Sequence, residues 1–130
     1  MLVRFECIPM VRPALMNVAE FERDNGAAID LVERPNESIV VVELPGVAKE
    51  DVKISLEGEL LTIKGERKTS GLPDGARWIR SERSSGEFFR TIQLPHPVKA
   101  DAVSAEMVNG VLRITLPKAE EARPREIGIK

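Results

Sequence analysis

The chain has 130 residues, 42% of them apolar and 31% charged, which suits one compact domain with tails. Its net charge is −2 and its basic residues are dispersed, so it carries no basic patch for binding nucleic acid. The single cysteine, Cys7, cannot form an internal disulfide, which excludes a disulfide-stapled secreted scaffold and is compatible with a reducing cytosol.

The hydrophobic pattern also indicates where the protein works. No apolar run approaches the roughly 20 residues that a membrane span needs. Charged residues and prolines interrupt the N-terminal region where a signal peptide would lie. We therefore expect a cytoplasmic protein with no stable membrane insertion. Aromatic residues make up 4% of the chain, so the core must consist mainly of Val, Ile and Leu, which favours strands.

Residues 1–26 form an arm that is rich in methionine and other apolar residues. Pro13 is suited to begin a short helix that would run to Phe21. One interpretation is a tail that packs on its own domain. The other is an adaptable apolar surface that contacts partners or other subunits. Under the second interpretation, the candidate contacts are Phe5, Leu15 and Phe21.

Residues 27–67 have the pattern of short strands separated by turns. The third of these strands is the clearest, because apolar residues at Val52, Ile54 and Leu56 alternate with polar ones. Turn residues such as Pro45-Gly46 separate the segments. The expected strands are 27–33, 38–44, 52–57 and 60–67.

Lys68 to Ser85 interrupts this rhythm with several glycine-containing turns. A segment of this length between regular strands is usually functional or disordered. Trp78 and Ile79 lie in its middle among polar residues, and their apolar area must be buried somewhere. Because free sheet edges also need covering, we expect this pair to leave its own domain and join a sheet edge of a neighbouring subunit.

The next segments complete a β-rich pattern. A strand over 87–94 ends at a Pro-His-Pro sequence, in which the only histidine, His96, is expected to be exposed. Asn109-Gly110 predicts the type I′ turn of a hairpin over 105–117, because both residues tolerate positive φ. Seven or so short strands without a long helix favour an antiparallel β-sandwich.

The last segment, 119–130, is charged and should be extended and exposed. It ends in Ile127-Gly128-Ile129, whose two isoleucines point the same way on an extended chain. Leaving each in water forgoes about 1.5–3 kcal/mol of burial. The alternatives are a frayed terminus and an anchor that docks elsewhere.

Taken together, these segments resemble the Hsp20/α-crystallin family of small heat shock proteins, in particular its bacterial and plant branch. The matching motifs are Val42–Val47 with Lys49–Val52, Leu60–Arg67, Glu82–Arg90 with Leu94-Pro95, Ala105 with Gly110-Val111-Leu112, and Ile127-Gly128-Ile129. The resemblance implies an all-β fold, an immunoglobulin-like antiparallel sandwich called the α-crystallin domain, over 27–118. A flexible N-terminal arm over 1–26 and a C-terminal extension over 119–130 would flank it.

The same resemblance implies an ATP-independent holdase, which binds unfolding client proteins under heat or other stress and prevents their aggregation. Subunits would form dimers that assemble into larger homo-oligomers. The segment 68–85, with Trp78 and Ile79, would be exchanged between the two subunits of a dimer. Arg90 would pair with acidic groups at the dimer interface; the alternative is a solvated charge on the wet face of its strand.

The resemblance also suggests a receptor for the tail. Ile127 and Ile129 would dock into the open edge between the two sheets of another subunit. The candidate groove residues are Val52, Ile54, Ala105 and Met107.

Two other functions are compatible with parts of this sequence. A p23-like sandwich that binds one defined partner as a monomer would lack the Ile-x-Ile tail and the long exchange segment. An enzyme is disfavoured, because the sequence has no metal-ligand cluster, phosphate-binding loop or nucleophile–base arrangement. We therefore expect no catalytic activity and no cofactor.

Overall fold

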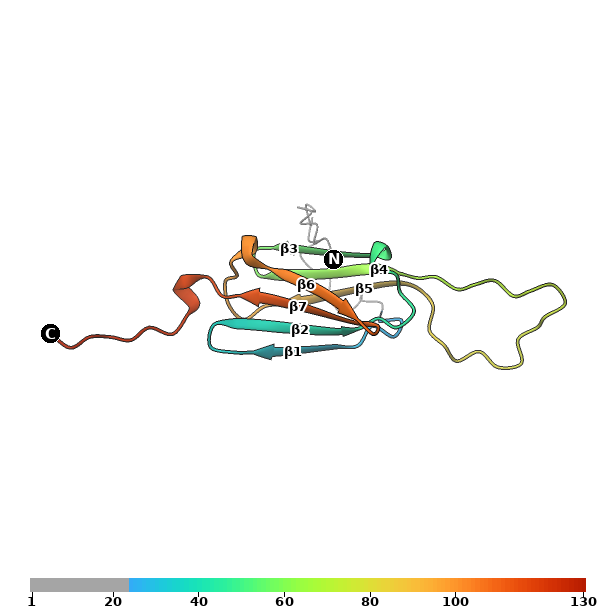
Figure 1. Ribbon diagram of the computed structural model, residues 1–130, viewed down its shortest axis with the longest axis horizontal. Helices are drawn as coiled ribbons and strands as arrows, with labels where there is room; N and C mark the ends of the chain where they lie inside the picture. The colour runs from blue at the N-terminus through green and yellow to red at the C-terminus, as the bar shows by residue number, and fades with distance from the viewer. Residues whose placement is uncertain (1–23) are drawn as a thin grey trace, which may run out of the picture.

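Two antiparallel sheets pack against a shared core in the computed structural model, which describes residues 24–130 (Figure 1). The interpretations that concern Phe5, Leu15, Phe21, Cys7 and the helix from Pro13 lie outside the described residues. The all-β sandwich predicted from the sequence is confirmed.

The first sheet has four strands in the order β1-β2-β7-β6, and the second has three in the order β3-β4-β5. Their bounds are β1 Ile29–Glu33, β2 Glu37–Glu43, β3 Val52–Glu57, β4 Leu60–Arg67, β5 Gly86–Gln93, β6 Ser104–Val108 and β7 Val111–Pro117. Among the described residues 24–130, three single-turn 3-10 helices lie in the loops: η2 Lys49–Asp51, η3 Ala100–Ala102 and η4 Glu120–Ala122. The sheet order leaves β1 and β6 at the edges of one sheet, and β3 and β5 at the edges of the other.

Side chains that alternate along the strands fill the space between the sheets. The buried set is aliphatic apart from Phe88, as the low aromatic content predicts. Its fully buried strand members include Val40, Val42, Leu61, Ile63, Phe88, Leu112, Ile114 and Leu116. This core holds the two sheets together.

The predicted hairpin joins β6 to β7. Asn109 and Gly110 have φ angles of 53° and 77°, as a type I′ turn requires, and Val108 pairs with Val111 across it. The Leu44 amide donates a hydrogen bond of 2.7 Å to the Gly110 carbonyl. The turn therefore also fixes the loop that leads out of β2.

Gly65 occupies the most crowded glycine position of the sandwich. Its register partners are Val52 and Phe88, which both point into the core. A Cβ atom on Gly65 would collide with the Asp51 carbonyl of η2 and would come within 2.7 Å of the Phe88 ring. The backbone of η2 can therefore lie against β4 only because residue 65 has no side chain.

Gly65→Ala should lower the free energy of unfolding by about 1–3 kcal/mol, because neither the Asp51 backbone nor the buried Phe88 ring can move freely. Denaturation followed by circular dichroism measures this. Gly71→Ala is the matched control, since nothing lies within 4 Å of the added atom. Equal stability of the two variants would contradict the crowding at Gly65.

Residues 24–26, which the sequence places in the arm, hydrogen-bond to the sandwich. The Asn25 side chain donates to the Glu87 carbonyl of β5. The buried Arg67 at the end of β4 donates to the carbonyls of Asn25 and Pro45. The chain thus approaches β1 across the edge of β5.

The expectation that His96 is exposed is wrong. Its side chain is 5% exposed; Nε2 lies 2.5 Å from Ser38 Oγ, and Nδ1 lies 3.0 Å from the Pro97 carbonyl oxygen. Because a carbonyl only accepts, Nδ1 donates to Pro97 and Nε2 is left to accept from Ser38. The Pro-His-Pro loop folds back along the end of β7, where the Lys99 amide donates to the Pro117 carbonyl.

Candidate functional site

The predicted groove residues lie along one open edge of the sandwich. β3 and β6 end their respective sheets, and Figure 1 shows β3 at the upper margin with β6 as the uppermost strand of the other sheet. Val52 and Ile54 are buried in the core, whereas Ala105 and Met107 are half-buried and pack against it. The structure therefore places all four predicted groove residues on the strands β3 and β6 at this edge, where they pack in or against the same core.

Leu56 is a further apolar residue of this edge that the candidate set omitted. It follows Val52 and Ile54 in the same alternating row of β3, and it remains half-buried. Together with Ala105 and Met107, Leu56 offers the apolar area that is still accessible there. The strict alternation along 52–56 was the signal that pointed to it.

Hydrogen bonds hold the C-terminal extension at the point where it leaves the sandwich. The Lys118 amide donates to the Asn36 carbonyl, and Lys118 Nζ lies 2.7 Å from Glu33 Oε1. The hydrogen bond from this ammonium lowers the pKa of the Glu33 carboxyl below its ordinary value. Arg123 Nε then donates to the Lys118 carbonyl at 3.0 Å.

Beyond these hydrogen bonds, the tail extends away from the sandwich (Figure 1). Ile127 is 87% exposed and Ile129 is 100% exposed. Both predicted anchor residues therefore lie away from the predicted groove of their own chain. Their proposed binding site must belong to another subunit or to another conformation of the tail.

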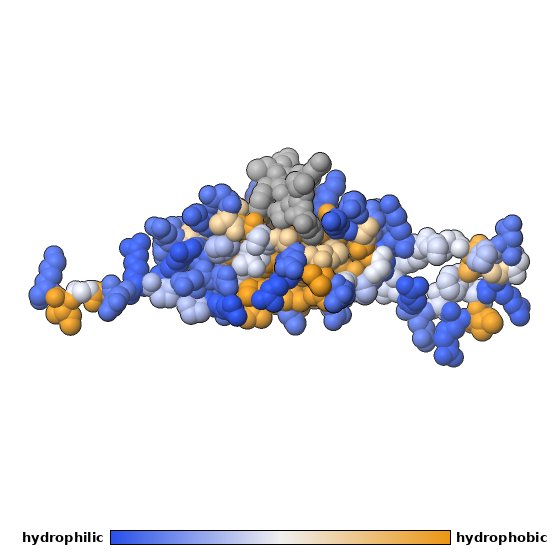
Figure 2. All heavy atoms as spheres, in the orientation of Figure 1, coloured by the Kyte–Doolittle hydropathy of each residue, from blue (hydrophilic) through white to orange (hydrophobic). Residues whose placement is uncertain are grey.

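The segment between β4 and β5 extends from the opposite end of the sandwich and contains no strand. A turn closed by the Ala76 amide and the Pro73 carbonyl reverses its direction. Trp78 is 63% exposed and Ile79 is 93% exposed. Figure 2 shows apolar residues near the far end of this segment and at the tip of the C-terminal tail.

Arg90 is held within the sandwich and is not a solvated charge on the wet face of β5, which removes the alternative raised by the sequence. Its side chain is 21% exposed; Nη1 donates to the Ala27 carbonyl at 2.9 Å and lies 3.6 Å from Asp24 Oδ1. Arg90 therefore fixes the segment that leads into β1. Its role at a dimer interface stays a prediction.

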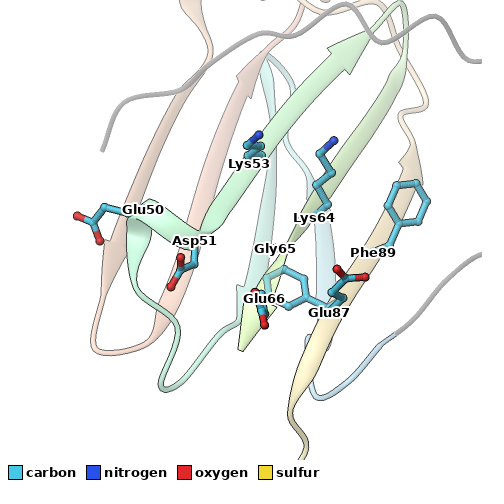
Figure 3. A pocket seen from close by; sticks show the side chains of 9 residues that line it. Glu50, Asp51, Lys53, Lys64, Gly65, Glu66, Glu87 and Phe89 are labelled. Atoms are coloured by element: carbon cyan, nitrogen blue, oxygen red, sulfur yellow. The ribbon is translucent and has the colours of Figure 1, made fainter. Parts of the chain in front are cut away.

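A hollow of about 600 Å³ lies on the outer face of the β3-β4-β5 sheet (Figure 3). Acidic side chains outnumber the two lysines, and Phe89 contributes an aromatic ring. Lys68 lies 3.1 Å from Asp51 at this surface, and this hydrogen-bonded carboxylate raises the pKa of Lys68. The lining residues are Glu50, Asp51, Lys53, Lys64, Gly65, Glu66, Glu87, Phe88 and Phe89.

Within residues 24–130, no helix is long and apolar enough to cross a membrane. The same part of the chain contains no group of three or more His, Cys, Asp or Glu side chains that could hold a metal ion.

Comparison with a family model gives a match over residues 30–130, to the model described as the Hsp20/alpha crystallin family. This range includes every strand of the sandwich except the first residue of β1, together with the tail.

Individual relatives agree with that match. A 16.9 kDa class I heat shock protein from rice, Oryza sativa subsp. japonica, is 44% identical over 99 residues, which are 75% of this chain and 66% of the rice protein. A 17.8 kDa class I heat shock protein from carrot, Daucus carota, is 39% identical over 125 residues, covering 92% of this chain and 78% of the relative. The chain thus spans slightly less than two thirds of the rice protein's length.

Two solved structures have similar folds. Heat shock protein 16.0 from Schizosaccharomyces pombe has a TM-score of 0.66 and 40% identity, over 80% of this chain and 97% of that one. A small heat-shock protein from Xylella fastidiosa, described as having a distinct high order structure, has a TM-score of 0.65 and 35% identity, over 80% and 95% of the two chains.

Proposed function

The chain belongs to the Hsp20/alpha-crystallin family, and from this membership we propose that it is an ATP-independent chaperone of the holdase type. It binds partly unfolded client proteins and keeps them from aggregating under heat or other stress. It acts without catalysis or a cofactor, as a cytoplasmic homo-oligomer built from dimers.

The observation that carries this proposal is apolar surface displayed on extensions of a stable sandwich. Trp78, Ile79, Ile127 and Ile129 are all more than half exposed, on two segments that project from opposite ends of the domain (Figure 1). A monomer would leave this area in water, which is unfavourable. This exposed apolar area is therefore what we expect of a subunit that associates with other copies of the chain.

For the dimer, the edge of β1 is the receptor that fits the exchanged segment. The β3 and β6 edges line the proposed tail groove, and residues 24–27 lie across β5 through Asn25 and Arg90. β1 keeps Leu31 and Val32 at 40% and 49% exposure. Covering this edge with Trp78 and Ile79 of a second copy would shield apolar area on both partners.

Arg90 positions the chain that leads into the same β1 edge. By holding the Ala27 carbonyl and Asp24, it fixes the chain immediately before β1. Arg90 therefore acts in the dimer at least through the position of β1, whether or not it meets acidic groups of the partner.

For assembly beyond the dimer, the spacing of the tail matches the spacing of the groove. Ile127 and Ile129 are two residues apart, and so are Ala105 and Met107 on β6. Side chains at such positions on extended segments share one face at the same interval. The tail of one dimer would lie along the β3–β6 edge of another.

Holdase activity is tested by heating an aggregation-prone client, such as a thermolabile enzyme, with the protein and no ATP. We expect light scattering to fall as the molar ratio of chaperone to client rises. A variant that begins at Asp24 should protect less, because it lacks the apolar arm while keeping the contacts of Asn25 and Arg67. Unchanged scattering at a molar excess of the full chain would contradict the proposal.

The p23-like adaptor was the rival sandwich function. The family match covers the region 30–130, including the Ile-x-Ile tail, and the exposed exchange segment is present as well. Both features favour the self-assembling chaperone over a monomeric adaptor. Size-exclusion chromatography distinguishes them, since an adaptor would elute as a monomer.

A further inference from the structure

A buried histidine lies where the C-terminal tail leaves the sandwich. The Pro-His-Pro loop, the turn between β1 and β2 and the start of the tail meet at one end of the domain (Figure 1). His96 and Lys118 are both buried there, and each contacts a polar side chain of the β1–β2 hairpin. The proposed chaperone activity uses none of these polar side chains, so their arrangement needs a separate explanation.

Two backbone hydrogen bonds tie the start of the tail to the loop that contains His96. The Lys99 amide donates to the Pro117 carbonyl at 2.9 Å, and the Ala119 amide donates to the Pro97 carbonyl at 3.0 Å. The Pro97 carbonyl also accepts from His96 Nδ1 at 3.0 Å. One carbonyl oxygen thus links the imidazole ring to the first residue of the tail.

These contacts fit the neutral form of His96. Nδ1 donates to Pro97, so Nε2 accepts from Ser38 Oγ. On protonation Nε2 becomes a donor, and the Ser38 hydroxyl has to direct its own hydrogen elsewhere. Ser38 is fully buried, and among residues 24–130 its hydroxyl has no other hydrogen-bond partner. Protonation therefore leaves a buried hydroxyl hydrogen without an acceptor, which is unfavourable.

The charges near His96 act in the same direction. Lys118 Nζ already donates to the Glu33 carboxylate and lowers its pKa, and a positive charge on His96 would lower that pKa further. An imidazolium would therefore compete with Lys118 for one carboxylate, and burial disfavours a second cation. The other charged side chains of the adjoining segments are Arg34 and Glu37, which pair with each other, Arg123, which binds the Lys118 carbonyl, the exposed Lys99, Glu120 and Glu121, and Glu59, whose carbonyl accepts from the Leu94 amide.

Hydration of a charged His96 requires its loop to move. Pro95 and Pro97 fix φ on both sides of the histidine, and a residue that precedes proline is itself restricted. The loop backbone therefore has few alternative conformations and moves as a unit. Because the ring is buried against Ser38, it reaches water when the loop separates from β2. That separation breaks the hydrogen bond between Ala119 and Pro97.

We propose that His96 is a proton sensor for the tail, and that its protonation between about pH 7 and pH 5 frees Ala119 and weakens assembly. The inference rests on the proposed docking of the tail and adds a control to it. At neutral pH the held tail leaves the sandwich in one direction, which reduces the ordering cost of docking. As the pH falls this contribution is lost, and the particle shrinks reversibly towards dimers.

Hydrogen exchange of the Ala119 amide tests the local event. The parent is the full-length chain with Ile127→Ala and Ile129→Ala, because without the anchors the tail contact cannot affect exchange. From about pH 7.5 to about pH 5.5, the protection factor of Ala119, corrected for the intrinsic rate, should fall. That of Ile114, in β7 between β2 and β6, should stay the same. Unchanged protection of Ala119 would overturn the proposal.

His96→Gln is the matched variant, because its amide cannot gain a proton in this range while its oxygen can accept from Ser38. Its Ala119 protection should not depend on pH. Should circular dichroism show this variant unfolded, His96→Asn replaces it, since that amide can donate to Pro97 as Nδ1 does. Glu33 does not confuse the result, because Lys118 lowers its pKa below the ordinary value and it stays ionised.

Sedimentation velocity of the wild-type chain tests the link to assembly. The particle should be smaller at about pH 5.5 and recover at about pH 7.5, whereas His96→Gln should keep its size. Equal shrinkage of His96→Gln in acid, or a wild-type particle that keeps its size, would overturn the sensor. The double isoleucine variant at neutral pH distinguishes the two proposals: if it shrinks, tail docking stands even where the sensor fails, and if it keeps the wild-type size, tail docking itself is wrong.

Discussion

Replacing Ile127 and Ile129 together by alanine should shrink the assembled particle towards dimers. In the proposed grooves the pair would contribute roughly 3–6 kcal/mol of gross apolar burial each time, before the cost of ordering the tail is subtracted. One such contact is weak, but many copies in a closed assembly hold one another in place. Sedimentation velocity measures the change in size.

The sandwich itself should be unaffected, because both isoleucines are at least 87% exposed in the single chain. Its melting temperature should therefore stay almost the same. Glu126→Ala with Lys130→Ala is the matched control, since it alters the flanking charges and keeps both anchors. A double isoleucine variant that sediments at the wild-type size would remove the tail as the assembly device.

The proposed receiving groove allows a second test of the same proposed contact. Met107 is half-buried at the β3–β6 edge, so a larger polar side chain there would obstruct the tail without opening the deep core. Val52 and Ile54 are unsuitable for this purpose, because they are buried and their substitution would destabilise the sandwich as well. Burial thus distinguishes Val52 and Ile54, which build the edge, from Met107, which would face the tail in the proposed contact.

Much of the fold was predictable because local signals agreed with one another. The Asn109-Gly110 turn, the alternation along Val52–Leu56 and the break at residues 68–85 each indicated an element that the structure contains. These signals are short-range, since they depend on backbone conformation and on one half-buried face. The resemblance of the motifs then connected them into one known architecture.

The wrong prediction concerns a polar residue, His96, whose environment is created by distant segments. Nothing near His96 in the sequence indicates that Ser38 will cover it, nor that its loop will fold back on β7. The burial of Arg67 depends on distant segments in the same way, because its acceptors are the carbonyls of Asn25 and Pro45. Burial of such side chains depends on long-range hydrogen bonds, which periodicity does not report.

The exchange segment illustrates a different limit. Its apolar pair and its length were visible in the sequence, and the structure adds that Trp78 and Ile79 find no cover in their own sandwich. The proposed receiving edge became identifiable only from the sheet order, which leaves β1 at an edge, and from the assignment of β3 and β6 to the proposed tail groove. The proposed partner edge of Trp78 and Ile79 therefore required the sheet topology.

Deleting Gly71–Glu82 should convert the protein into monomers that keep their β circular dichroism. Arg67 and Gly86 are direct partners at the ends of β4 and β5, so residues 68–70 and 83–85 can still close that hairpin. The deletion removes Trp78 and Ile79, the apolar pair of the proposed exchange. The edge of β1 is then left without its proposed cover.

Multi-angle light scattering after size exclusion measures the resulting mass. Leu72→Ser is the matched control within the same loop, because Leu72 is also exposed yet lies outside the Trp78-Ile79 pair. It should leave the dimer intact, whereas Trp78→Ser with Ile79→Ser should weaken it nearly as much as the deletion does. Dimers that persist after the deletion would mean that another surface joins the subunits. Since the β3 and β6 edges and Arg90 remain in that variant, these would be the first places to look for it.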